Sequence, residues 1–114
     1  GNDDNTYELS PEMLRQMQAA ARRIKGARIE DIGTGRRWEP SDETLIFGGR
    51  GVIPVKGLGS FMSAARLRWN GRSHVVQKLG WMSLTVNGKK VKESALEDGD
   101  RLKIGASEFE YMLS

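Results

Sequence analysis

Cysteine is absent from this chain, and histidine occurs once, as His74. Without cysteine the chain forms no disulfide and offers no thiolate ligand, and a single imidazole cannot build a histidine metal cluster. We therefore predict no metal and no other cofactor. No nucleophile–base set is visible, and the glycine-containing segment GGRGVIPVKG at 48–57 lacks the spacing of a Walker phosphate loop. The sequence predicts a protein that is not an enzyme.

Long hydrophobic runs are also absent, so no segment has the length of a membrane span and no signal peptide is visible. The chain begins at Gly1 without a methionine, which suggests a fragment of a longer protein, membrane-anchored or not. We expect no membrane contact by the fragment itself and a cytoplasmic location. The net charge of +3 comes from scattered Lys and Arg, not from one block, and it is weak support for nucleic acid binding.

The 114 residues suffice for one domain with a single core, preceded by a leader. Residues 1–8 are polar. Ser10 is a good helix N-cap and Pro11 suits the first helical position, while Gly26 can end the helix. Leu14, Met17, Ala21 and Ile24 recur on one face. We predict a polar leader and short amphipathic helix over 1–26 and a β domain over 27–114.

The segment LTVNGKKVKESALEDGDRLKI at 84–104 carries the strongest strand pattern. Asn87-Gly88 predicts a type I′ hairpin turn, which needs positive φ at both central residues. Leu102 and Ile104 then alternate with charged residues, as in a strand with one buried face.

Further strand signals recur at short spacing before and after that segment. We predict strands over 27–32, 36–38, 44–47 and 108–113, an edge strand over 52–55 that carries Pro54, and a hairpin over 66–79 that turns at Asn70-Gly71. The run 61–65 is ambiguous between helix and strand. The pattern is typical of an all-β sandwich or barrel.

In its β portion the chain resembles the forkhead-associated (FHA) family. The resemblance rests on the hairpin ARIEDIGTGRRWEP, the strand TLIFGGR with its final Gly-Arg, the hairpin ARLRWNGRSHVVQKLG, and the closing TVNGKKV…LEDGDRLKIGASEFEYML. It implies an FHA-like (SMAD/FHA) two-sheet β-sandwich whose loops at one end bind a phosphothreonine peptide. A phosphate with nearly two negative charges needs an arginine and hydroxyl or amide donors on rigid loops.

The resemblance carries few of the family's phosphate-binding residues over to this chain. Arg50 matches the arginine of Gly-Arg. The family's Ser-Arg-X-His motif is replaced, with Phe61 at its serine, Met62 at its arginine and Ala64 at its histidine.

A slip in that alignment would bring Ser60 or Ser63 near the pocket. Ser83-Leu84-Thr85 stands where the family has Asn-Gly-Thr, and only Thr85 keeps its type. The resemblance thus implies Arg50, Ser60, Ser63 and Thr85 as phosphopeptide-binding candidates.

Each hydrogen bond to a charged group contributes about 1.5–3 kcal/mol, and about 1.4 kcal/mol is a tenfold change in affinity. Losing the family's serine and asparagine would therefore weaken phosphopeptide binding by roughly a hundredfold or more. We predict a degenerate FHA domain with weak or lost phosphothreonine recognition.

Apolar residues stand where the phosphate-binding residues would be, and they predict a protein-interaction patch of Phe61, Met62, Trp81 and Met82. The alternative is that these four side chains fill the sandwich core.

Other conspicuous residues have structural interpretations. We expect Trp38 and Trp69 in core or cross-strand packing and His74 at the surface beside a hairpin turn. Asp98 and Asp100 flank a glycine, which is turn chemistry.

The favoured function is a non-enzymatic interaction module of a signalling or scaffold protein, with another protein as partner. A functional phosphothreonine-binding FHA domain is one alternative. A second is an S4-like RNA-binding module, which TVNGKKVKESALEDGDRLKI also resembles, but such a module needs two basic helices immediately before that hairpin.

Overall fold

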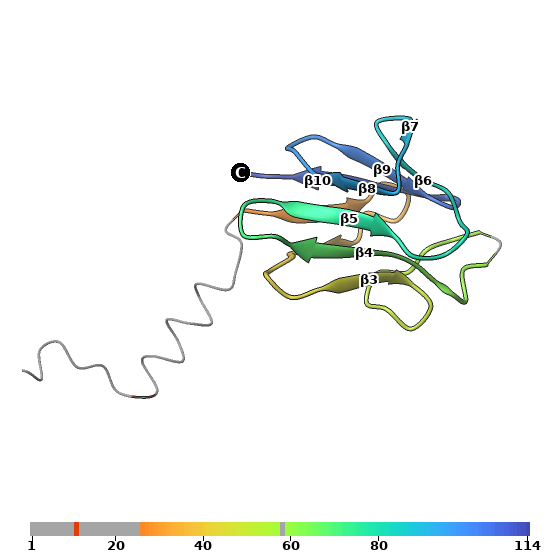
Figure 1. Ribbon diagram of the computed structural model, residues 1–114, viewed down its shortest axis with the longest axis horizontal. Helices are drawn as coiled ribbons and strands as arrows, with labels where there is room; N and C mark the ends of the chain where they lie inside the picture. The colour runs from red at the N-terminus through yellow and green to blue at the C-terminus, as the bar shows by residue number, and fades with distance from the viewer. Residues whose placement is uncertain (1–10, 12–25, 58) are drawn as a thin grey trace, which may run out of the picture.

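The computed structural model describes residue 11 and the ranges 26–57 and 59–114, and its strands form two facing antiparallel sheets (Figure 1). One sheet has the strand order β2-β1-β10-β9-β6-β7, and the other has the order β3-β4-β5-β8. The strands are β1 Arg28–Asp31, β2 Arg37–Trp38, β3 Leu45–Gly48, β4 Ser63–Trp69, β5 His74–Lys78, β6 Leu84–Val86, β7 Lys89–Lys90, β8 Glu93–Ala95, β9 Arg101–Ile104 and β10 Ser107–Met112. The predicted all-β sandwich is confirmed.

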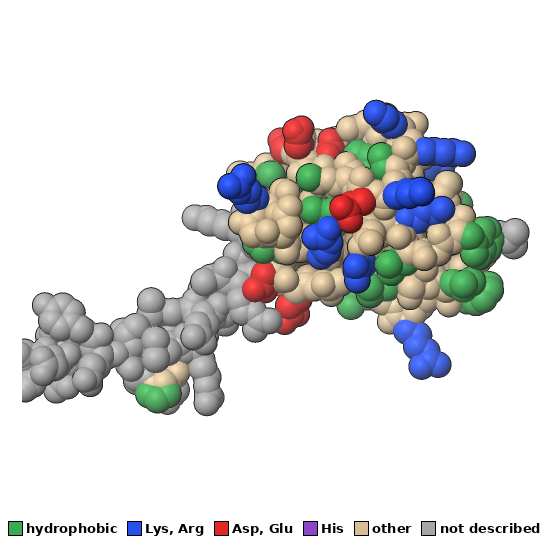
Figure 2. All heavy atoms as spheres, in the orientation of Figure 1, with side chains coloured by type: hydrophobic (Ala, Val, Ile, Leu, Met, Phe, Trp, Pro, Cys, Tyr) green, Lys and Arg blue, Asp and Glu red, His purple; other side chains and the backbone are tan. Residues whose placement is uncertain are grey.

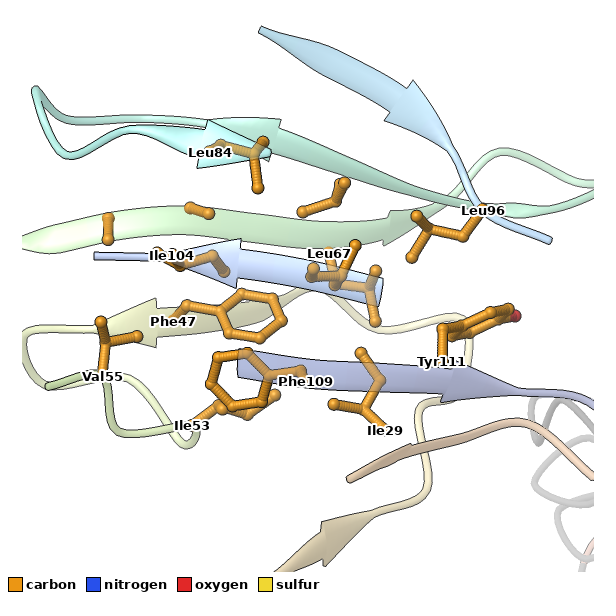
Figure 3. Packing of buried hydrophobic residues seen from close by; sticks show 14 of the residues in the cluster. Ile29, Phe47, Ile53, Val55, Leu67, Leu84, Leu96, Ile104, Phe109 and Tyr111 are labelled. Carbon is orange, nitrogen blue, oxygen red and sulfur yellow. The ribbon is translucent and has the colours of Figure 1, made fainter. Parts of the chain in front are cut away.

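The core lies between the sheets and is made of alternating residues from both of them (Figure 3). Phe47 on β3 and Phe109 on β10 meet edge to face, with ring centroids 5.2 Å apart. Trp38, on the same sheet as Phe109, also packs against it, with a centroid distance of 6.5 Å. The Phe47–Phe109 pair joins the two layers. The expectation of core packing for Trp38 is therefore confirmed.

The predicted hairpin turn is present between β6 and β7. Asn87 has φ of +52° and Gly88 of +83°, the two positive values that a type I′ turn requires. The Asn87 side chain also donates to an Asp100 carboxylate oxygen at 2.9 Å, which ties this turn to the loop before β9. Asp98 accepts from the Leu113 amide at 2.8 Å, so both aspartates serve turn geometry, as predicted.

His74 lies in the core, and the prediction of a surface position was wrong. Its side chain is 0% exposed, and Trp69 packs on it with ring centroids 5.0 Å apart. Nδ1 lies 2.6 Å from the Tyr111 hydroxyl and Nε2 lies 2.9 Å from the Ser41 carbonyl oxygen. His74 begins β5 with its ring between the two sheets, so position beside a turn did not decide its exposure.

Two other expectations differ from the structure. Residues 52–55 form no strand, and only Ile53 makes an isolated bridge to Phe47, because Pro54 lacks the amide that a ladder needs. Between Gly57 and Gly80 the described residues form β4 and β5 and no helix, which contradicts the S4-like alternative.

The predicted leader and N-terminal helix lie outside the described residues, apart from residues 11 and 26. Nowhere in the described ranges is there a helix long and apolar enough to cross a membrane.

Candidate functional site

One end of the sandwich gathers the loops that precede β4, β6 and β10. These are the β3–β4 loop at 49–62, the β5–β6 loop at 79–83 and the β9–β10 turn at 105–106, at the right-hand end of Figure 1. The strands are antiparallel, so β3, β5 and β9 end where β4, β6 and β10 begin. Loops anchored at both ends by paired strands can hold side chains in fixed positions.

Arg50 stands in a tight turn directly after β3. Gly51 donates its amide to the Gly48 carbonyl at 2.9 Å, and the Gly49 amide donates to the Ser60 carbonyl at 3.0 Å, so backbone bonds fix both sides of the turn. The Arg50 side chain is exposed and makes no ion pair or hydrogen bond with the described residues. Its guanidinium is thus available to an anion from outside.

The Ser63 hydroxyl borders this turn. Its Oγ lies 3.2 Å from the point where a β-carbon on Gly49 would stand, so the hydroxyl borders the residue before Arg50. Ser60 is half-buried in the same loop, and its amide donates to the Gly57 carbonyl at 3.1 Å. Arg50, Ser60 and Ser63 therefore share one loop region. Their phosphate-binding role stays a prediction.

Thr85 lies elsewhere. It occupies the middle of β6, where its Cα partners are Lys90 and Lys103. The structure does not bring Thr85 to the loop that holds Arg50.

Four exposed apolar side chains lie in the β3–β4 and β5–β6 loops, and we call Phe61, Met62, Leu79 and Trp81 the apolar patch. Phe61 is 80% exposed and Trp81 is 58% exposed, so neither fills the core. The Trp81 indole lies across Gly59, where an added β-carbon would be 2.5 Å from its ring. The Leu79 amide donates to the Ala64 carbonyl at 2.9 Å, which holds the β5–β6 loop against the start of β4.

In Figure 2 hydrophobic side chains gather at this right-hand end of the molecule. Met62 and Leu79 are exposed as well, by 41% and 43%. Exposed apolar side chains that gather at one end of a domain are typical of a surface for contact with another protein.

Met82 does not belong to this surface, and its prediction as an exposed patch residue was wrong. It is only 6% exposed, and its Cε fills the space beside Gly57 and Gly105. The signal was in the sequence, because Met82, Leu84 and Val86 are spaced by two and share the buried face of β6. Leu79 is the patch residue that sequence reasoning missed.

Two clefts flank Trp81. One, of about 680 Å³, lies toward the β9–β10 turn and is lined by Gly57, Trp81, Met82, Ser83, Lys103, Gly105, Ala106 and Glu108. The other, of about 400 Å³, is lined by Lys78, Trp81, Ser83, Leu84, Lys90, Val91 and Lys92, and we call it the lysine cleft. Neither of these two clefts is lined by Arg50, Ser60 or Ser63. The described residues hold no group of three or more His, Cys, Asp or Glu side chains suited to a metal.

Comparison with known proteins identifies the architecture. No family model matches the sequence, and no curated relative matches it. The fold is similar to a domain solved in a study of phosphothreonine-dependent FHA domain interactions, with TM-score 0.69 and 26% identity over 77% of this chain and 96% of that one. It is also similar to the FhaA FHA domain, solved with the intracellular domain of Rv3910, with TM-score 0.66 and 26% identity over 75% of this chain and 98% of that one.

The FHA domain of the CT664 protein from Chlamydia trachomatis shares the fold at 18% identity, with TM-score 0.68 over 77% of this chain and 97% of that one. These domains have the same two-sheet architecture over nearly their whole length. Taken with the Gly-Arg turn after β3 and the Asn-Gly turn after β6, the similarity supports an FHA domain.

Proposed function

We propose that this FHA domain binds a segment of another protein through the apolar patch, and that a phosphothreonine adds little to the affinity. The observation that carries the proposal is the exposure of Phe61 and Trp81 at the loop end, 80% and 58%. Burying about 100 Å² of Trp81 in a complex would contribute about 2.5 kcal/mol at 25 cal/mol per Å². Large aromatic side chains of this kind dominate the binding energy of many interfaces.

The phosphate side of the site supports only weak recognition. Arg50 is available, and Ser63 brings one hydroxyl next to its turn. However, the aligned position of the family's serine carries Phe61, whose side chain has no hydrogen-bonding group. Because the Arg50 guanidinium is exposed, its contact with a phosphate would resemble an exposed ion pair, which contributes about 0–1 kcal/mol.

The alternative is a functional phosphothreonine-binding site, and the adjacency of Ser63 to the Arg50 turn favours it. The similar domains described above include one from work on phosphothreonine-dependent interactions and one in complex with a protein domain. Both functions use the same loop end. They differ in the residues that contribute most to peptide binding, which are Phe61 and Trp81 in the proposal and Arg50 in the alternative.

A peptide library in phosphothreonine and unphosphorylated forms tests the proposal, with affinities from fluorescence anisotropy. We expect Trp81→Ala and Phe61→Ala each to weaken the binding of selected peptides about tenfold or more, whether or not the peptide is phosphorylated. Arg50→Ala should change the affinity less than threefold. Leu113→Ala is the matched control, because Leu113 is an exposed apolar residue that follows β10 at the other end of the sandwich. Binding that requires phosphate and is abolished by Arg50→Ala would overturn the proposal in favour of the alternative.

A further inference from the structure

The lysine cleft concentrates positive charge beside the apolar patch. Lys78, Lys90 and Lys92 line it, together with one side of Trp81. Figure 2 shows Lys and Arg side chains gathered where β5 ends and β8 begins, next to the hydrophobic side chains of the right-hand end. No acidic side chain of the described residues lines this cleft.

The strand register holds two of these lysines opposite each other. In the β5–β8 ladder Gln77 pairs with Glu93, and the Lys78 amide donates to the Lys92 carbonyl at 2.8 Å. In this antiparallel register Lys78, the residue after Gln77, therefore faces Lys92, the residue before Glu93. Like charges directly opposite each other on neighbouring strands are destabilising.

No carboxylate of the described residues forms a salt bridge with these lysines. Glu93 is the nearest acidic residue in the chain, but its Oε1 binds Arg68 at 3.1 Å. Within the described ranges Lys78, Lys90 and Lys92 form no salt bridge. A cleft with three ammonium groups and no internal counter-ion is suited to an anion from a partner.

Lys78 also belongs to the inner face of its strand. Val76 is buried, and Lys78 follows it by two residues, so it continues that face to the point where the sheets open. It is half-buried, and Leu84 and Val91 line the same cleft. A charged group bound there is partly removed from water, where its attraction to the ammonium groups is stronger than at an open surface.

We propose that the lysine cleft binds a carboxylate or phosphate group of the same protein segment whose apolar residue occupies the apolar patch. This inference rests on the proposed function and names the partner class, a segment with an apolar residue followed or preceded by an acidic or phosphorylated one. The start of β4 and the start of β8 are two strand spacings apart, about 10 Å at about 4.8 Å each. An extended chain covers that distance in about three residues.

The probes are short synthetic peptides with one leucine anchor and a glutamate, phosphoserine or glutamine placed two to five residues away on either side. Binding is followed by amide and indole NMR signals of the full chain. We expect the glutamate and phosphoserine probes to bind at least fivefold tighter than the glutamine probe, best at a separation near three residues. The gain should fall as salt is added.

The double variant Lys78→Gln/Lys92→Gln should lose the gain and keep the affinity for the glutamine probe. Lys89→Gln is the matched control, because Lys89 is an exposed lysine of β7 next to Lys90 that does not line the cleft. An equal gain in the double variant, or an equal loss in the control, would overturn the inference. So would tighter binding of a short single-stranded RNA to the same lysines.

The signals separate the two proposals. Shifts at Phe61 and Trp81 without any at Lys78 and Lys92 leave the proposed function standing and refute the anion site. Shifts at the lysines with acidic probes, without any at Phe61, refute the apolar-patch function and support the anion site alone. A gain in affinity with the phosphoserine probe but not with the glutamate probe identifies phosphate as the group that the cleft binds.

Discussion

The buried His74 makes the stability of this domain depend on pH, and the direction of this dependence follows from the contacts of its ring. The Ser41 carbonyl oxygen can only accept, so Nε2 of His74 carries the proton and donates to it at 2.9 Å. Nδ1 is then the acceptor, and the Tyr111 hydroxyl donates to it at 2.6 Å. Burial lowers the pKa of His74 and raises the pKa of Tyr111 to about 12, so both groups are neutral in the folded domain at pH 7.

The sign of the pH effect follows from the lowered pKa of His74. Between the ordinary pKa of about 6.5 and the lowered pKa of the folded state, the unfolded chain binds a proton at this histidine and the folded chain does not. The stability supplied by neutral His74 is fully present above the ordinary pKa and is lost as the pH falls toward the folded-state pKa. The largest possible slope for one group is about 1.4 kcal/mol per pH unit.

Replacing the ring removes this dependence. In His74→Gln the side chain does not titrate but can still donate to Ser41 or accept from Tyr111, and we expect a loss of about 1–3 kcal/mol at pH 7.5. Urea unfolding at several pH values between 5 and 7.5 measures the free energy of unfolding of both proteins. The difference in this free energy between wild type and variant should shrink as the pH falls, because only the wild type loses the stability supplied by neutral His74. Carboxylates titrate in both proteins, so their contribution cancels in the difference.

Parallel pH profiles for wild type and His74→Gln would refute this reasoning. They would mean that the His74 ring reaches solvent or exchanges its proton without cost in the folded domain. Tyr111→Phe supplies an independent check, since it leaves Nδ1 without a donor, and it should cost about 1–2 kcal/mol at pH 7.5.

Three further predictions concern the turns, and thermal or urea unfolding measures the free energy of unfolding for each of them. Gly88→Ala should cost about 1 kcal/mol, because its φ of +83° disfavours any side chain although no atom lies within 4 Å of the added carbon; Gly33→Ala, without positive φ, should be nearly neutral. Gly105→Ala should cost about 2–4 kcal/mol, because its φ is +60° and its added carbon would stand 2.9 Å from the Lys56 carbonyl oxygen and overlap the end of Met82; a cost equal to that of Gly88→Ala would contradict this packing. Asp100→Ala should cost about 1–2 kcal/mol through the lost bonds to the turns before β7 and β9, and Asp100→Asn should restore part of it.

Local chemistry accounts for the parts of the fold that the sequence predicted. Positive φ at Asn87 and Gly88 is a property of two adjacent residues, so the β6–β7 turn could be read directly. The alternation of Leu102 with Ile104 and of Phe109 with Tyr111 likewise depends on a period of two along one strand. These local patterns were enough for an all-β sandwich, and for Arg50 directly after a strand.

Local sequence pattern was not enough to predict which side chains are exposed at the loop end. Phe61, Met62 and Trp81 had two possible positions, in the core or at the surface, and the structure places all three at the surface, with the Trp81 ring over Gly59. Met82 went to the core because its spacing from Leu84 puts it on the buried face. Thr85 fell within a strand, away from Arg50, because β6 extends through it.

By itself the sequence determined most of the strands, the Asn87-Gly88 turn and the family that the chain resembles, since these depend on neighbouring residues. Only the tertiary structure decided that His74 is enclosed, that Lys78 faces Lys92, and that Trp81 separates two clefts. Each of these depends on which strands become neighbours. β5 and β8 pair although the whole β6–β7 hairpin, which belongs to the other sheet, lies between them in the chain. No periodicity within one segment records a pairing between distant segments, because that pairing is set by how the two sheets together cover the core.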